Sequence, residues 1–131
     1  MPEQEDKVGQ PHDHFCRATI SDPVKAGALL LEQLPTEISS CLSSELPVLV
    51  EGSFVDETLR GLLLDRLYQV KTIHGRPALV YVLVDHKSTP DTFISWQLLK
   101  YKVEIWKQWT RENPKWTHLP PIIPCHDLSC L

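Results

Sequence analysis

The chain lacks several features that would place it in a common functional class. No apolar run approaches the roughly 20 residues that a membrane helix requires, so we expect no membrane association. None of the five glycines forms a glycine-rich phosphate loop, and nothing therefore indicates ATP use. The N-terminal residues Met1–Asp6 are polar and acidic rather than a secretory signal. We therefore expect a cytoplasmic protein.

The cysteines form no recognisable pattern, and acidic residues outnumber basic ones. The four cysteines are irregularly spaced, and without a secretory signal we expect them to be reduced thiols. The formal net charge is −4, which argues mildly against tight non-specific binding to DNA. The C-terminal third is nevertheless locally basic and permits a nucleic-acid substrate, through Lys100, Lys102, Lys107, Arg111 and Lys115.

The pattern of apolar residues predicts one small α/β domain behind a disordered tail at 1–11. Two strands, at 62–70 and 78–87, are joined by a turn containing Gly75 and Pro77. The second strand is apolar at nearly every position, so it lies within the sheet with helices over both faces. We therefore expect helices before this strand pair and another after it.

A long helix is predicted from residue 91 or 92 to Asn113. Apolar residues recur in it at helical spacing, and we expect this stripe to pack on the sheet: Phe93, Trp96, Leu99, Val103, Trp106 and Trp109. The four tryptophans are accordingly expected to serve packing rather than to form a base-stacking platform.

Charged residues follow the two strands in a pattern that suits metal-dependent chemistry. Side chains alternate along a strand, so Asp85 and Lys87 share a face that His86 does not. A hairpin brings Asp65 of the neighbouring strand close to them. Two carboxylates can hold Mg²⁺, helped by the backbone carbonyl of His86, and a lysine can stabilise a phosphate or orient water. The alternative is that these acids only cap strand ends and that Lys87 is a solvated charge.

Three further residues are candidates for a supporting role. Gln97 and Tyr101 share a helix face at a spacing of four residues, away from the tryptophan stripe. They can hold a phosphate or orient a ligand, or they are a chance surface pair. Asp13 lies between two histidines at the start of the first helix, and it either reaches the site or only starts that helix.

Several separate motifs, in order from Pro11 to Pro124, resemble the recombination-promoting nuclease family, also called the YhgA-like putative transposases. They include Pro-His-Asp-His-Phe-Cys-Arg at 11–17, Leu-Pro-Thr-Glu-Ile at 34–38, Gly-Ser-Phe-Val-Asp-Glu at 52–57, Asp-Arg-Leu-Tyr-Gln-Val at 65–70 and Leu-Pro-Pro-Ile-Ile-Pro at 119–124.

This resemblance implies a restriction-endonuclease-like PD-(D/E)xK core, with a mixed sheet flanked by helices and a Mg²⁺-dependent (or Mn²⁺-dependent) site that cleaves DNA. Asp65 matches the first acid of the family and Asp85 the second, where glutamate followed by His-Gln is common. Lys87 replaces that glutamine and restores the lysine of the wider superfamily. Gln97 and Tyr101 match the Q-x-x-x-Y helix motif of related nucleases.

The end of the chain departs from the family. Members continue past the proline-rich run into an apolar strand, which residues 125–131 do not resemble. We therefore expect a truncated nuclease-like domain at 12–124, an aberrant tail at 125–131, and a last strand that is missing or incomplete. An open sheet edge would permit self-association or pairing with an intact family member.

The sequence therefore predicts a bacterial Mg²⁺-dependent DNA endonuclease that hydrolyses phosphodiester bonds with metal-activated water. The alternative is an inactive, truncated homologue that acts at most as a DNA-binding or protein-binding module.

Overall fold

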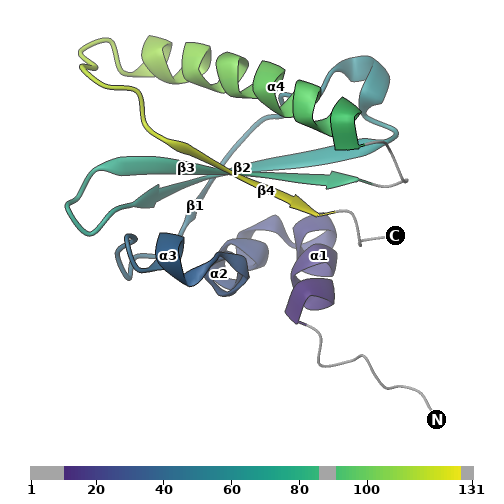
Figure 1. The fold of residues 1–131 in the computed structure, drawn as a ribbon, viewed down its shortest axis with the longest axis horizontal. Coiled ribbons are helices and arrows are strands. Elements are labelled where there is room, and N and C mark those ends of the chain that lie inside the picture. The colour runs from purple at the N-terminus through teal and green to yellow at the C-terminus, as the bar shows by residue number, and fades with distance from the viewer. Residues whose placement is uncertain (1–10, 86–90, 128–131) are drawn as a thin grey trace.

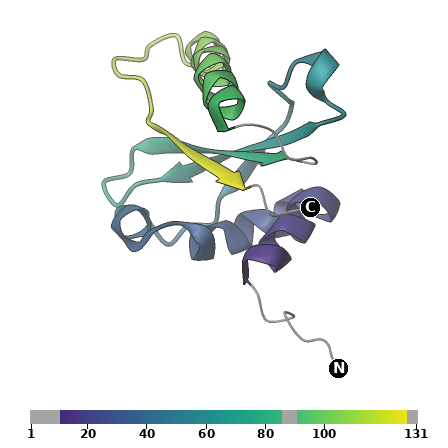
Figure 2. The same cartoon turned by 45° about the vertical axis from the view of Figure 1, so that its right-hand side comes forward.

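A four-stranded sheet lies between two layers of helices in the computed structural model, which describes residues 11–85 and 91–127 (Figure 1). One face of the sheet is covered by α4 (Asp91–Glu112), and the other by α1 (Pro11–Ser21), α2 (Pro23–Gln33) and α3 (Thr36–Ser39). The turned view shows the same separation (Figure 2). The predicted mixed sheet with flanking helices is confirmed. None of the described helices combines the length and apolar character needed to cross a bilayer.

The strands follow one another across the sheet in chain order. β2 (Leu63–Lys71) pairs antiparallel with both β1 (Val48–Val50) and β3 (Pro77–Asp85). The turn between β2 and β3 contains Gly75, whose φ of 80° favours glycine. The predicted hairpin and the central, doubly buried β3 are therefore both confirmed.

The strand β4 (Ile122–Asp127) corrects the expectation of a missing or incomplete last strand. It pairs in parallel with β3 over its full length, from Ile122 opposite Leu79 to Asp127 opposite Val84. The predicted domain boundary after Pro124 therefore falls inside a strand. Proline and polar residues suggested a break, but an edge strand tolerates a proline because only one of its sides is paired.

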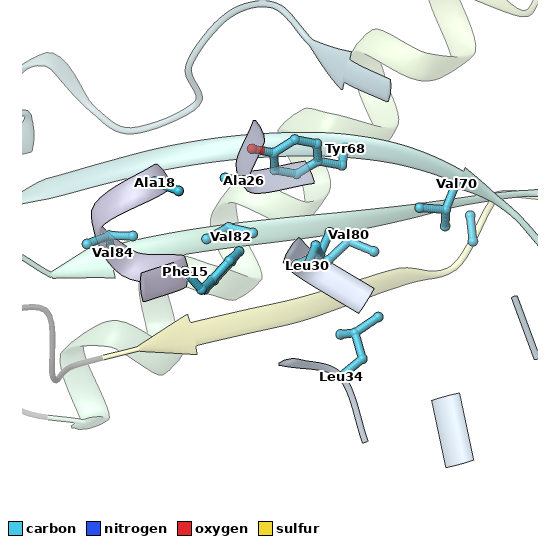
Figure 3. Packing of buried hydrophobic residues seen from close by; sticks show 11 residues of the cluster. Phe15, Ala18, Ala26, Leu30, Leu34, Tyr68, Val70, Val80, Val82 and Val84 are labelled. Atoms are coloured by element: carbon cyan, nitrogen blue, oxygen red, sulfur yellow. The ribbon is translucent and has the colours of Figure 1, made fainter. Parts of the chain in front are cut away.

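The face under α1 and α2 is an apolar core, which we call the α1–α2 face (Figure 3). Its buried members are Phe15, Ala18, Ala26, Leu30, Leu34, Tyr68, Val70, Ala78, Val80, Val82 and Val84. Asp22 caps α2 by accepting a hydrogen bond from the Lys25 N–H at 3.1 Å. Gly27 allows the close approach of α2, since a Cβ there would lie 3.1 Å from the Tyr68 ring.

The opposite face, which we call the α4 face, packs against a different stripe of α4 from the one predicted. Ile94, Gln97, Tyr101 and Ile105 are buried, whereas Trp96, Leu99 and Val103 are exposed. The two stripes differ by one residue, or about 100° around the helix. The prediction holds for Phe93 and Trp109, which are partly buried against this face. It is wrong for the three exposed residues because it selected the most apolar stripe, whereas this face of the sheet is itself partly polar. The expected packing role also fails for Trp96 and Trp116, which are 65% and 44% exposed.

Candidate functional site

Asp65 is a buried acid on the α4 face of the sheet. It is the third residue of β2, lies opposite Leu83 of β3 and is only 2% exposed. Its strand neighbours on this face are Leu63 and Leu67, which are also buried. A carboxylate in such surroundings needs hydrogen-bond partners, because an unpaired buried charge is strongly unfavourable.

Within residues 11–85 and 91–127, three donors bond to the Asp65 carboxylate. The Ser53 hydroxyl donates to Oδ1 at 2.5 Å, while the Phe54 N–H and the Tyr81 hydroxyl donate to Oδ2 at 2.7 and 2.5 Å. Gly52, directly before Ser53, has a φ of 115°, which favours glycine. A carboxylate has about four lone-pair sites. The three bonds therefore orient the group, and together they use three of these sites.

Tyr81 is held as a permanent donor to this carboxylate. Burial, followed by the charge of Asp65 and the hydrogen bond to it, raises the pKa of Tyr81 well above its ordinary value. Its ring makes edge-to-face contacts with Phe54 and Tyr101, with centroid distances of 6.2 and 6.3 Å. The hydroxyl therefore stays protonated at physiological pH, and the ring cannot easily turn away.

A second set of contacts ties the loop that carries Ser53 and Phe54 to α4. The Asp56 N–H donates to the Tyr101 hydroxyl oxygen at 3.4 Å, and the Lys100 ammonium lies 2.7 Å from Asp56 Oδ2. The hydrogen bond to Asp56 raises the pKa of Lys100, and burial raises that of Tyr101. Tyr101 therefore helps to position the loop that donates to Asp65, and its predicted role toward a ligand stays a prediction.

Gln97 lies one helical turn before Tyr101 and is 7% exposed. Within the part of the chain that the structure describes, its Oε1 is buried and has no hydrogen-bond partner. Leaving such an acceptor unpaired costs about 1–3 kcal/mol. A buried polar atom without a partner is unusual in native proteins and is a common sign of a ligand or a functional role.

A hollow of about 370 Å³ opens beside Asp65, and its lining residues include Arg60 and Arg66. Arg60 follows the short 3₁₀ helix η2 (Glu57–Leu59), and Arg66 donates from Nη1 to the backbone carbonyl of Asp65 at 2.9 Å. The charge of these side chains suits an anionic ligand such as a phosphate.

Four residues of this region were not predicted from the sequence: Arg60, Arg66, Ser53 and Tyr81. Tyr81 could have been predicted, because it lies four residues before Asp85 in β3 and positions at that spacing in a strand lie on the same face of the sheet.

The backbone register brings the two predicted acidic positions near each other. Asp85 is the last residue of β3 and lies opposite Leu63, two residues along β2 from Asp65. Such diagonal positions are about 7–8 Å apart. The side chain of Asp85 is outside the described set, as are His86 and Lys87 altogether. Asp13 lies in α1, across the sheet from α4, and its side chain is likewise not described.

The described side chains contain no cluster of three or more His, Cys, Asp or Glu residues able to hold a metal ion. Asp65 supplies one hard oxygen donor of the kind Mg²⁺ prefers, and position 85 is the second acidic position in reach. The chemistry of this one carboxylate is compatible with a divalent cation, and metal binding by Asp65 stays a prediction.

These features define an α/β domain whose buried, hydrogen-bonded carboxylate faces a hollow with guanidinium groups. The family model described as "Putative transposase, YhgA-like" matches residues 10–126. The chain therefore belongs to this family, as its sequence motifs indicated.

Named relatives include both nucleases and a protein called inactive. The chain is 31% identical to recombination-promoting nuclease RpnD of Escherichia coli O157:H7, over 87% of this chain and 43% of that protein. It is 29% identical to nuclease RpnA of Escherichia coli K12, over 87% of this chain and 38% of RpnA. The "putative inactive recombination-promoting nuclease-like protein YjiP" of the same strain is 30% identical, over 72% of this chain and 91% of YjiP.

The chain thus spans less than half the length of the two nucleases it resembles. No solved structure is significantly similar to it.

Proposed function

We propose that the chain is a Mg²⁺-dependent (or Mn²⁺-dependent) DNA endonuclease domain with a PD-(D/E)xK core. The observation that carries this proposal is the buried Asp65 carboxylate, oriented by three donors beside a hollow with two arginines. The names of RpnD and RpnA support nuclease activity in the family.

Asp65 and Asp85 would hold the metal, with the backbone carbonyl of His86 as a further ligand. When bound, a divalent cation polarises the scissile phosphate and lowers the pKa of a coordinated water. Lys87 would serve the phosphate or the water, and Arg60 and Arg66 would bind flanking phosphates. Gln97 would accept a hydrogen bond within the closed site, and Tyr101 would keep the donor loop in place.

Nicking of supercoiled plasmid DNA in Mg²⁺ or Mn²⁺ tests this proposal. Asp65→Asn keeps the shape of the side chain but removes its charge, and we expect the cleavage rate to fall roughly 100-fold or more. Glu104→Gln is the matched control, because it removes one exposed negative charge from α4 and should leave the rate unchanged. Cleavage by Asp65→Asn at the wild-type rate would exclude Asp65 from the reaction.

A second candidate is an inactive homologue that binds DNA or an intact family member. The similarity to YjiP, which covers 91% of that protein, favours it. The outer strands of the described sheet, β1 and β4, each pair on one side only and could bind another strand. This candidate predicts complex formation in a chelator such as EDTA and no nicking when Mg²⁺ or Mn²⁺ is added.

A further inference from the structure

A second hollow, of about 750 Å³, lies at the end of the sheet remote from Asp65. Its walls come from the β2–β3 turn, the last turn of α4 and the segment at 115–121 that leads into β4. Both views place these segments side by side at the same end of the molecule (Figures 1 and 2). Asp65 is six residues from Lys71, where β2 ends, so the two hollows are about 20 Å apart along the strand.

Hydrogen bonds fix the walls of this hollow. The Trp106 indole N–H donates to the Pro120 carbonyl at 2.8 Å. The backbone N–H of Trp116 donates to the Asn113 carbonyl at 3.0 Å. In the turn, the N–H of Thr72 donates to the carbonyl of Arg76 at 2.8 Å. The hollow is therefore largely formed before any ligand binds, as is usual for binding sites.

The charge of the lining suits an anion. Arg76 and Lys115 line the hollow, and none of its lining residues is acidic. Neither cation forms an ion pair with a described residue, whereas Lys71, Lys100 and Lys107 do. A positive hollow on a chain of net charge −4 is complementary to a phosphate group.

Aromatic surface adjoins these cations. Trp116 is 44% exposed and Trp109 is half-buried, and both line the hollow. An indole face beside a cation suits a nucleobase attached to a phosphate, because bases stack on aromatic side chains and the backbone binds cations. In a duplex the base faces are already stacked inside, so an unpaired strand suits this lining better.

We propose that this hollow, the Trp116 pocket, binds an unpaired nucleotide of single-stranded DNA, with Trp116 stacking on the base and Arg76 and Lys115 holding adjacent phosphates. The inference rests on the proposed action on DNA. It gives the domain a second contact with its substrate, about 20 Å from the proposed cleavage site, and it favours DNA that carries single-stranded segments.

Fluorescence anisotropy with a labelled oligothymidylate in EDTA tests the Trp116 pocket without cleavage. We expect Trp116→Ala to weaken binding roughly tenfold or more, and Trp116→Phe to retain most of it. Arg76→Gln and Lys115→Gln should each lower the slope of log affinity against log salt concentration by about 0.7. Trp96→Ala and Lys25→Gln, which change an exposed tryptophan and an exposed lysine elsewhere, should match the wild type.

Unchanged oligothymidylate binding by Trp116→Ala, with its fold verified by thermal unfolding, would overturn the inference. Equal affinity for a blunt duplex of the same length would also overturn it. Because EDTA removes metal from the assay, the two proposals fail separately. Trp116-dependent binding without plasmid nicking would contradict the nuclease proposal alone, whereas normal nicking without Trp116-dependent binding would contradict the pocket alone.

Discussion

The two faces of the sheet use the same strands for different purposes. On the α1–α2 face, the buried hydroxyls of Thr19 and Tyr68 donate to backbone carbonyls, and every other buried side chain named for that face is apolar. On the α4 face, Asp65 and Tyr81 bond to each other, and Gln97 has a buried oxygen with no partner among the residues that the structure describes. The first arrangement is that of a stabilising core. The second places polar groups in the interior, as is common at functional sites.

Strand alternation makes this division possible. In β2 and β3 consecutive residues face opposite layers, so Asp65 and Tyr81 lie among residues that pack under α4, while Tyr68 and Val80 lie under α2. Substitutions on the two faces should therefore separate stability from activity.

The largest effect is expected from Leu30→Ala on the α1–α2 face. Leu30 is fully buried, and its truncation should lower the free energy of unfolding by about 2–5 kcal/mol through lost burial and a cavity. Chemical denaturation measures the loss. Nicking by the fraction that remains folded should keep the wild-type rate, and a fall in that rate would show that the two faces are coupled.

Tyr81→Phe should reduce activity more than stability. It keeps the ring contacts but removes one of the three donors to Asp65, so we expect the nicking rate to fall roughly 10- to 100-fold, as for groups that orient a metal ligand. Tyr68→Phe is the matched control on the other face, since it removes a donor to the Pro23 carbonyl. If both variants cleave alike, Tyr81 has no special role.

Gln97→Leu should stabilise the protein, whereas Leu30→Ala should destabilise it. Replacing a buried, unpaired amide oxygen with an apolar group should raise the free energy of unfolding by about 1 kcal/mol, while nicking decreases. Urea titration and the plasmid assay measure the two quantities. A destabilised variant with normal activity would mean that Gln97 belongs to the core.

The smallest effect concerns alkaline pH. Burial raises the pKa of Tyr68 to about 12, so between pH 10 and 12 the unfolded chain releases a proton that the folded chain keeps. The stabilising contribution of Tyr68 is therefore complete below pH 10 and falls by about 1 kcal/mol between pH 10 and 11. Denaturation at pH 10 and pH 11 gives the free energy of unfolding of the wild type and of Tyr68→Phe, and the wild type should lose about 1 kcal/mol relative to the variant. The same difference between the two proteins at both pH values would contradict the prediction.

Local patterns in the sequence were sufficient to predict much of the fold. The apolar run from Leu79 to Val84 and the turn at Gly75 predicted the hairpin. The face of α4 could not be predicted in this way. Its orientation depends on the polar groups of the sheet, and hydrophobicity alone favoured the stripe of Trp96 and Leu99.

The site was predicted only in outline. Asp65 was identified from its residue type and strand, and the register brings position 85 near it. Its donors were not identified, because Ser53 and Phe54 come from a loop 11 or 12 residues away in the chain, and Tyr81 comes from the next strand. Such contacts depend on tertiary packing, which a single sequence does not display. The functional roles of all the predicted site residues stay predictions, those of Asp65, Asp85, His86, Lys87, Gln97, Tyr101 and Asp13 alike.

The most direct measurement of the central claim is calorimetric titration of Mg²⁺ into the wild type and Asp65→Asn, with Glu104→Gln as control. We expect saturable binding of Mg²⁺ by the wild type and by the control, and loss of this binding in Asp65→Asn. Binding of Mg²⁺ by Asp65→Asn with wild-type affinity would contradict it, because the acid under α4 would then not be a metal ligand.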